Sequence, residues 1–122
     1  MRYSRILIVD DSATSRMIVR RCLEMAGYSD AMFLEAADGA LALDLLETNT
    51  VDLIVTDIKM PRMDGRTLVR KLQSNPTTSD MPVLVVSSVA AVSEEGDSLG
   101  SNVLAAVQKP LSPAKLMQAL KE

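Results

Sequence analysis

Short apolar segments alternate along the chain with longer stretches in which apolar residues recur at helical spacing. The segments fall at residues 6–9, 51–55, 83–86 and 103–107, and a weaker one falls at 33–36. In the first four, Val, Ile, Leu or Ala follow one another with little polar alternation, which is typical of strands in a parallel sheet covered by helices on both faces. The pattern therefore predicts four buried strands and a weaker fifth strand.

The stretches between the strands carry the signals of helices. Residues 12–26 place apolar side chains near helical spacing and stop at Gly27, which suits the left-handed residue after a helix. Capping residues open three further helices: Asp38 before 40–47, Asp64-Gly65 before 66–74, and Ser112-Pro113 before 114–121.

A fifth helix is predicted less strongly at residues 93–99. This stretch begins with capping chemistry, but Gly96 and Gly100 weaken it as a helix. Strands and helices alternate without a linker, repeat or low-complexity segment, which argues for an α/β fold with helices on both faces of an open parallel sheet. In such sheets ligands bind outside the carboxyl ends of the strands, so the residues that follow each strand are the functional candidates.

The length of the chain indicates how many domains it forms, and its composition excludes several kinds of functional site. A chain of 122 residues with 48% hydrophobic content matches one ordinary domain that can bury a core. Its net charge is −3, and its 13 basic and 16 acidic residues are spread along the chain, so no polybasic nucleic-acid surface is expected. The absence of histidine excludes His triads and His metal clusters, and a single cysteine excludes an internal disulfide.

Hydropathy gives no sign of membrane insertion or export. No apolar run approaches the roughly 18–20 residues that cross a bilayer. Asp10-Asp11 follow the first apolar segment too soon for a secretory signal. We therefore expect a cytoplasmic chain whose partners are proteins rather than nucleic acid or membrane.

Polar residues end four of the predicted strands. They are Asp10-Asp11, Asp57, Ser87-Ser88 and Lys109-Pro110. Each has a plain structural explanation when taken alone, as a turn or cap, a loop residue, a strand-end hydroxyl or a solvated cation. A chance α/β domain would seldom place acids after strands one and three, a hydroxyl after strand four and Lys-Pro after strand five.

Three clustered carboxylates favour a bound cation. They repel one another and raise each other's pKa values unless a positive charge lies among them. Oxygen ligands without His or Cys suit a hard ion, and an incomplete protein cage suits Mg²⁺ better than Ca²⁺. A carboxylate beside such an ion can attack a phosphoryl group, and Lys109 can neutralise the phosphoryl oxygens.

These residues resemble the receiver domain of two-component response regulators, especially the stand-alone chemotaxis type, which is CheY-like. The resemblance rests on residues 8–12, on Asp57 with Met60-Pro61 and Asp64-Gly65, on residues 82–87 and on Lys109-Pro110. It covers essentially the whole chain and implies one receiver domain over residues 1–122, without a separate effector domain. The implied fold is a flavodoxin-like (βα)5 three-layer sandwich with the strand order 2-1-3-4-5 known for CheY-like proteins.

The resemblance assigns a role to each strand-end residue. Asp57 would be the phosphoacceptor, Lys109 would pair with the phosphoryl oxygens, and Ser87 would hydrogen-bond to them. The Lys109–Pro110 peptide would be cis. The implied ligands of Mg²⁺ are Asp10, Asp11, Asp57 and the backbone carbonyl of Lys59.

The resemblance also implies partners. A chain without histidine would take its phosphoryl group from a phosphohistidine of a sensor histidine kinase or a histidine phosphotransfer protein. Phosphorylation would shift an equilibrium between two conformations and change binding to a downstream protein that the sequence leaves unknown. Such a protein is not an enzyme in the usual sense, because it catalyses only its own phosphorylation and dephosphorylation.

Three positions concern how such a signal would leave the site. Many receivers carry an aromatic residue on strand five, three positions before the lysine, and this chain has Ala106 there. Either the segment after strand four carries the change directly, or the protein relays or stores phosphate with little conformational output. Lys59 and Val89 occupy positions that border the path of attacking water in the family, where Lys59 either blocks that water or is only a solvated side chain.

Three other functions fit the residues less well. A haloacid-dehalogenase type of phosphatase needs acid-x-acid after the first strand, and Ser12 stands at the third place. An FMN- or nucleotide-binding domain would need a Gly-rich phosphate loop after that strand, which is missing. A receiver that serves only as an interaction module would not need the five site residues, which are all present: Asp10, Asp11, Asp57, Ser87 and Lys109.

Overall fold

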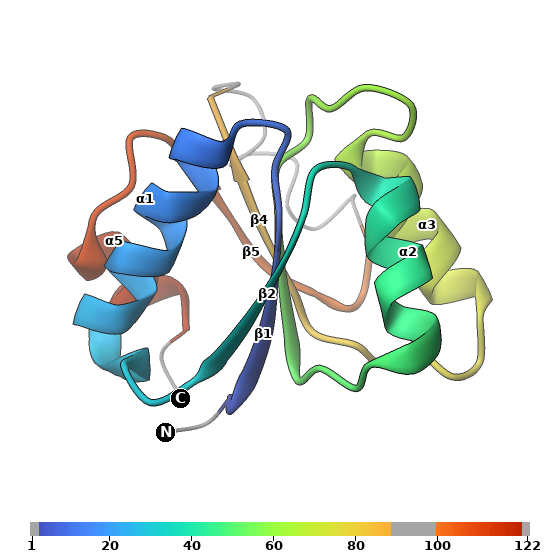
Figure 1. Cartoon of the computed structure of the whole chain (residues 1–122), viewed down its shortest axis with the longest axis horizontal. Coiled ribbons are helices and arrows are strands. Elements are labelled where there is room, and N and C mark those ends of the chain that lie inside the picture. Colours follow the sequence, from blue (N-terminus) through green and yellow to red (C-terminus); the bar gives the residue numbers. More distant parts are fainter. Residues whose placement is uncertain (1–2, 89–99, 121–122) are drawn as a thin grey trace.

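Five parallel strands form one sheet in the order β2-β1-β3-β4-β5, which confirms the order implied by the resemblance (Figure 1). This computed structural model describes residues 3–88 and 100–120. The predicted helix at 93–99 and the position of Val89 lie outside the described residues. The strands are β1 (Arg5–Val9), β2 (Met32–Ala36), β3 (Leu53–Thr56), β4 (Val83–Ser87) and β5 (Val103–Gln108).

Helices cover both faces of the sheet and complete three layers. The helix α1 packs with α5 on one face, and α2 packs with α3 on the other (Figure 1). In the part of the chain that is described, the helical elements are α1 (Ala13–Leu23), a π-helical turn η1 (Glu24–Tyr28), α2 (Gly39–Thr48), α3 (Gly65–Ser74) and α5 (Pro113–Ala119). None of these helices is long and apolar enough to span a bilayer.

Capping residues begin these four α-helices, and the sequence indicated three of them, those of α2, α3 and α5. Each cap accepts a hydrogen bond from the backbone N–H three residues later, which satisfies one donor that has no partner inside the helix. The caps are Ser12, Asp38, Asp64 and Ser112. The first helix differs at its other end, because the α-helical part stops at Leu23 and a wider turn continues to Tyr28, with Gly27 at φ 113°.

The strand predicted at 51–55 begins later, at Leu53. Asp52 explains the difference, because its side chain accepts hydrogen bonds from the backbone N–H groups of Ser4 and Arg5, at 3.0 Å each, and from the Ser4 hydroxyl at 2.8 Å. The Asp52 side chain thus binds the backbone at the start of β1. Val51 is buried but lies outside the strand.

Both faces of the central strands are buried, as the apolar runs predicted. In β1, Ile6 and Ile8 pack into the cluster beneath α1 and α5, whereas Leu7 and Val9 pack into the cluster beneath α2 and α3. All four side chains are at most 1% exposed. The ladder continues past the strand ends, where Asp57 N–H donates to the Val9 carbonyl at 2.9 Å and Asp10 N–H donates to the Ala36 carbonyl at 3.0 Å. Backbone pairing therefore fixes the residues that leave the sheet at its carboxyl edge.

Candidate functional site

The polar strand-end residues converge at the edge of the sheet that lies uppermost in Figure 1. Asp10 and Asp11 follow β1, and Asp57 follows β3, the neighbouring strand. Parallel strands present their carboxyl ends at one edge, so residues far apart in sequence meet there. The arrangement brings the three predicted carboxylates together.

The three carboxylates form one compact group. One oxygen from each of Asp10, Asp11 and Asp57 lies within 4.8 Å of the others, and no other group of this kind occurs among the described residues. Asp10 is 3% exposed, Asp57 is half-buried and Asp11 faces solvent. Carboxylate oxygens alone, with an open side toward water, are a donor set that fits Mg²⁺.

Lys109 lies against two of these carboxylates. Its Nζ donates to Asp10 Oδ2 at 2.9 Å and to Asp57 Oδ2 at 3.2 Å. The ammonium therefore supplies a positive charge beside the clustered acids. Three carboxylates and one ammonium leave a formal charge of −2, which a divalent ion would balance.

The ionisation of Asp10 and Lys109 follows from these contacts. Burial acts most strongly on Asp10 and opposes its ionisation, but hydrogen bonds from Ser15, Ser12 and Lys109 together lower its pKa below the usual value. Burial also disfavours the charged form of Lys109, yet the hydrogen bond to Asp10 and the nearby charge of Asp57 raise its pKa. Both shifts favour a charged pair, as expected where a positive charge lies beside clustered carboxylates.

Ser15 belongs to the same cluster and was not predicted. Its hydroxyl donates to Asp10 Oδ2 at 2.5 Å and accepts from Lys109 Nζ at 2.7 Å. A signal was present in the sequence, because Ser15 is the third residue after the cap Ser12, and side chains there point back toward the start of the helix. That start lies directly after the acidic pair.

The segment between β3 and α3 is held closely to the end of β3. Gly65 N–H donates to the Ile58 carbonyl at 2.8 Å. A Cβ at Gly65 would lie 2.2 Å from the Asp57 carbonyl oxygen and 2.9 Å from Ile58 Cα. Only glycine permits this close approach, so the first residue of α3 fixes the backbone that carries Asp57.

Arg62 anchors the tip of the same segment. Its backbone is left-handed, with φ 64°, and the N–H of Met63 donates to the Pro61 carbonyl at 2.6 Å, which closes a γ-turn. The Arg62 guanidinium donates through Nε to Asp38 Oδ2 at 2.7 Å and pairs with it through Nη2 as well. Asp38 is 1% exposed, so a buried carboxylate at the start of α2 holds this strained turn.

An open hollow lies beside the carboxylates. It is lined by Asp11, Lys59, Asp64, Arg66 and the apolar residues Ile58, Met60 and Pro61. The Lys59 side chain is exposed, and its backbone belongs to the segment that follows Asp57. The hollow leaves room for a ligand next to Asp11.

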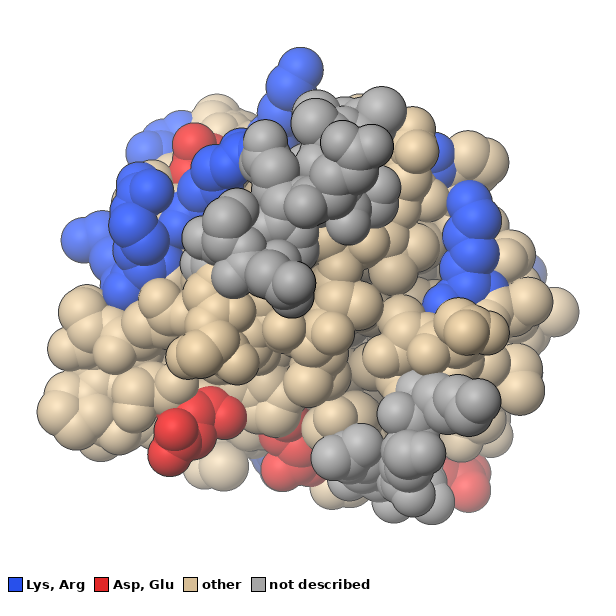
Figure 2. Space-filling model, turned by 180° about the vertical axis from the view of Figure 1, so that it is seen from behind, with Lys and Arg blue, Asp and Glu red and all other residues tan. Residues whose placement is uncertain are grey.

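Positive side chains gather around the β3–α3 segment and α3. Residues 59–71 include five cations and one acid, a formal charge of +4 in a chain whose total is −3. Seen from behind, Lys and Arg side chains collect at the upper left, on the side where α3 lies (Figure 2). This distribution favours the approach of an anionic ligand from that side.

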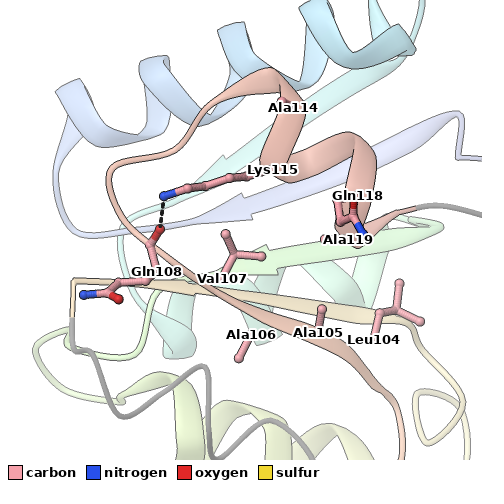
Figure 3. Close-up of a pocket in the computed structure, with 9 residues that line it drawn as sticks. All are labelled: Leu104, Ala105, Ala106, Val107, Gln108, Ala114, Lys115, Gln118 and Ala119. Carbon is pink, nitrogen blue, oxygen red and sulfur yellow. Dashed lines mark hydrogen bonds between the residues drawn. The ribbon is translucent and has the colours of Figure 1, made fainter.

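The structure also places Ser87 and Ala106, which the sequence singled out. Ser87 is fully buried at the end of β4, and its carbonyl accepts from the N–H of Lys109 at 2.8 Å. The Lys109–Pro110 peptide is cis, as the resemblance implies. Ala106 packs against the α2–α3 side of the core, and its side chain points away from α5 (Figure 3).

On the opposite face of β5, Val107 and Ala105 border a shallow pocket beneath α5 (Figure 3). Lys115 Nζ closes one end of it by donating to the Gln108 carbonyl at 3.3 Å. Small side chains in this part of β5 leave the strand without an aromatic group on either face.

Comparison with known proteins agrees with this geometry. The family model for the response regulator receiver domain matches residues 6–121. A chemotaxis protein CheY homolog of Campylobacter jejuni subsp. jejuni is 35% identical over 119 residues, which cover 97% of this chain and 90% of the relative. Response regulator MprA of a Mycobacterium species (strain KMS) is 38% identical over 117 residues, which cover 96% of this chain and 49% of MprA.

Solved structures give the same result. Chemotaxis protein CheY4 of Vibrio cholerae is 29% identical, with a TM-score of 0.78 and coverage of 97% of this chain and 96% of that one. A putative response regulator from Chloroflexus aurantiacus is also 29% identical and has a TM-score of 0.82, with coverage of 97% and 94%.

Proposed function

The chain belongs to the family of response regulator receiver domains of two-component signalling, and from this premise we propose that Asp57 accepts a phosphoryl group. One observation carries the proposal. The Lys109 ammonium donates to Asp57 and to Asp10, two of the three carboxylates clustered at the carboxyl edge of the sheet. A cluster with only a structural role would not need a lysine against two acids beside an open hollow.

The residues around Asp57 support a nucleophilic role. Its Oδ1 accepts from the N–H of Ile58 at 2.7 Å, which orients the carboxylate, and its Oδ2 accepts from Lys109. In the proposed step an Asp57 oxygen attacks the phosphorus of a phosphohistidine. The new O–P bond forms as the P–N bond breaks, and the imidazole nitrogen keeps the bonding electron pair and is then free to take up a proton.

Lys109 and Ser87 would hold the transferred group. The ammonium already lies at Asp57, where it can neutralise phosphoryl oxygens, and the Ser87 hydroxyl at the end of β4 would donate to them. Lys59 and Val89 would border the water that later hydrolyses the aspartyl phosphate. Turnover is thus confined to the protein's own acyl phosphate, as fits a signalling protein.

A Mg²⁺ ion fits the carboxylate group. Asp10, Asp11, Asp57 and the backbone carbonyl of Lys59 would hold it, and when bound it would supply positive charge to the phosphoryl oxygens. The formal charge of −2 left by three carboxylates and Lys109 supports a divalent ion. The chain's own contribution is to fix these oxygens on neighbouring strands.

We further propose that the donor is a sensor histidine kinase or a histidine phosphotransfer protein in the cytoplasm. No histidine exists in the chain to supply the phosphoryl group internally. Residues 1–122 would act as one receiver domain whose phosphorylation changes its binding to a downstream protein, without a role for nucleic acid or membrane.

Ala106 favours a second function, a phosphate relay or sink with little conformational output. An alanine cannot swing a large ring inward, so the aromatic route from phosphate to surface is closed in this chain. Amide spectra with and without a beryllofluoride mimic of the phosphoryl group separate the two functions. Shifts confined to Asp10, Asp57, Ser87 and Lys109 indicate the relay, whereas shifts that spread across β5 and α5 indicate a switch.

The central proposal is tested by incubating the protein with acetyl phosphate and Mg²⁺ and measuring intact mass. We expect wild type to gain the mass of one phosphoryl group, and we expect Asp57→Asn to gain none. A parallel incubation with a chelator controls for the metal. An unmodified wild-type protein, or equal modification of Asp57→Asn, would contradict the proposal.

A further inference from the structure

Ser15 closes a ring of three hydrogen bonds with Asp10 and Lys109. Its hydroxyl donates to Asp10 Oδ2 at 2.5 Å and accepts from Lys109 Nζ at 2.7 Å, while Lys109 Nζ donates to that same Asp10 oxygen at 2.9 Å. A hydroxyl carries one hydrogen and acceptor lone pairs, so one Ser15 side chain can make both bonds at once. The ring ties helix α1 to the lysine that follows β5.

The ring fixes the direction of the third lysine N–H. An ammonium has three N–H groups, and Lys109 directs them to Ser15, Asp10 and Asp57. With two of them engaged in the ring, the remaining one is aimed at Asp57 Oδ2, 3.2 Å away. Without such contacts a lysine side chain turns easily on its flexible four-carbon stem.

We propose that Ser15 is a positioning residue for Lys109. It holds the ammonium toward Asp57 before a phosphoryl group arrives, and it does not touch that group itself. Donors that are already oriented lower a barrier because they need no reorganisation during the reaction. This inference rests on the proposed function of Asp57.

The Ser15 side chain can be removed without disturbing the helix start. The cap of α1 is the Ser12 hydroxyl, which accepts from the backbone N–H of Ser15 at 3.2 Å, and Ser15→Ala keeps that N–H. Alanine is also a better helix former than serine. Thr14, the exposed neighbouring hydroxyl residue on the same turn, provides a matched control.

The first measurement needs neither metal nor phosphate. In the metal-free full chain, the ¹⁵N–¹H signal of the Lys109 ammonium, assigned by its loss in Lys109→Arg, reports how firmly its protons are held. We expect a sharp signal at low temperature in wild type and in Thr14→Ala. It broadens or disappears in Ser15→Ala and returns in Ser15→Thr, which restores the hydroxyl.

The second measurement is the rate of phosphorylation by acetyl phosphate with Mg²⁺. In this reaction an O–P bond forms at Asp57 while the O–P bond of acetyl phosphate breaks, and acetate leaves with the electron pair. We expect Ser15→Ala to be slower by about tenfold, the loss expected for one hydrogen bond that orients a charged group. Ser15→Thr recovers most of the rate, and Thr14→Ala keeps it. Urea unfolding of each variant confirms that the folded protein is being compared.

Two results would overturn the inference. One is an ammonium signal in Ser15→Ala that equals that of wild type, and the other is an altered signal with an unaltered rate. A wild-type protein that takes up no phosphate would refute the function of Asp57 instead, while the ammonium signal would still decide whether Ser15 holds Lys109.

Discussion

Gly65→Ala is expected to slow phosphorylation at Asp57, although Gly65 itself has no side chain that could take part in the reaction. The new Cβ would lie 2.2 Å from the Asp57 carbonyl oxygen and 2.9 Å from Ile58 Cα. Both are backbone atoms, so no side chain can rotate away to make room. Restoring a tolerable carbon–oxygen contact requires the start of α3 and the end of β3 to separate by about 1 Å.

That displacement sets the size of the effect. A reacting group misplaced by about 1 Å typically loses on the order of 100-fold in rate. Overpacking at a buried contact costs about 1–3 kcal/mol of unfolding free energy. The variant should therefore stay folded at room temperature and yet take up phosphate about 100 times more slowly than wild type.

The assay follows intact mass over time with acetyl phosphate and Mg²⁺, with urea unfolding monitored by circular dichroism. Gly39→Ala is the matched control, because the three atoms nearest to its Cβ would all belong to the Met63 side chain, with Cγ and Sδ at 2.9 Å and Cβ at 3.2 Å, and the far end of that flexible side chain can move. We expect Gly39→Ala to keep nearly the wild-type rate. A Gly65→Ala protein that is phosphorylated as fast as Gly39→Ala and unfolds at the same urea concentration would refute the reasoning.

Three further predictions concern other contacts. Arg62→Gly should be more stable than Arg62→Ala by about 1 kcal/mol, because both lose the ion pair to Asp38 but only alanine keeps the left-handed strain; equal urea midpoints would argue against strain at this turn. Asp52→Asn should lose about 1–2 kcal/mol at pH 7, since hydrogen bonds, foremost from Ser4, lower the pKa of Asp52. Because this pKa is lowered, the ionised Asp52 stabilises the folded protein at pH values above its ordinary pKa of 3.8, and the stabilisation is lost as the pH falls through the pKa of the folded state. The difference in unfolding free energy between Asp52→Asn and wild type should therefore shrink by pH 3. A difference that does not depend on pH would exclude this cause. Lys59→Ala should shorten the lifetime of the aspartyl phosphate several-fold, because the exposed ammonium borders the hollow beside Asp11; an unchanged decay, followed by intact mass, would count against such a role.

The sequence was most informative where one physical rule acts on many residues at once. Apolar runs predicted parallel strands, and all five occur in the expected places. Burial was predicted correctly for β1, β3 and β4, but wrongly for β5, because an edge strand is covered less completely than a central one. Because parallel strands end at one edge, Asp10, Asp57 and Lys109 could be expected to meet before any coordinates existed. The helix starts were equally predictable, since a capping residue acts only on its own first turn.

Contacts made by residues that do not directly follow a strand could not be predicted. Ser15 and Lys109 are 94 residues apart, and Arg62 and Asp38 are 24 apart, so no local pattern links either pair. Left-handed backbone is typical of glycine, so nothing local in the sequence indicated that Arg62 adopts it or that its side chain pairs with Asp38. The lowered pKa of Asp10 depends on contacts of the same kind, because the Ser15 hydroxyl and the Lys109 ammonium that bond to it belong to other parts of the fold.

The distance along the chain between Asp10 and Lys109 has a consequence for biosynthesis. The two residues are 99 positions apart, although their side chains touch. A ribosome releases the strands that carry the carboxylates, β1 and β3, well before the strand that delivers the ammonium. A nascent chain that has not yet released β5 therefore lacks the Lys109 ammonium, and the contacts of Lys109 with Asp10 and Asp57 can form only after that strand has been made.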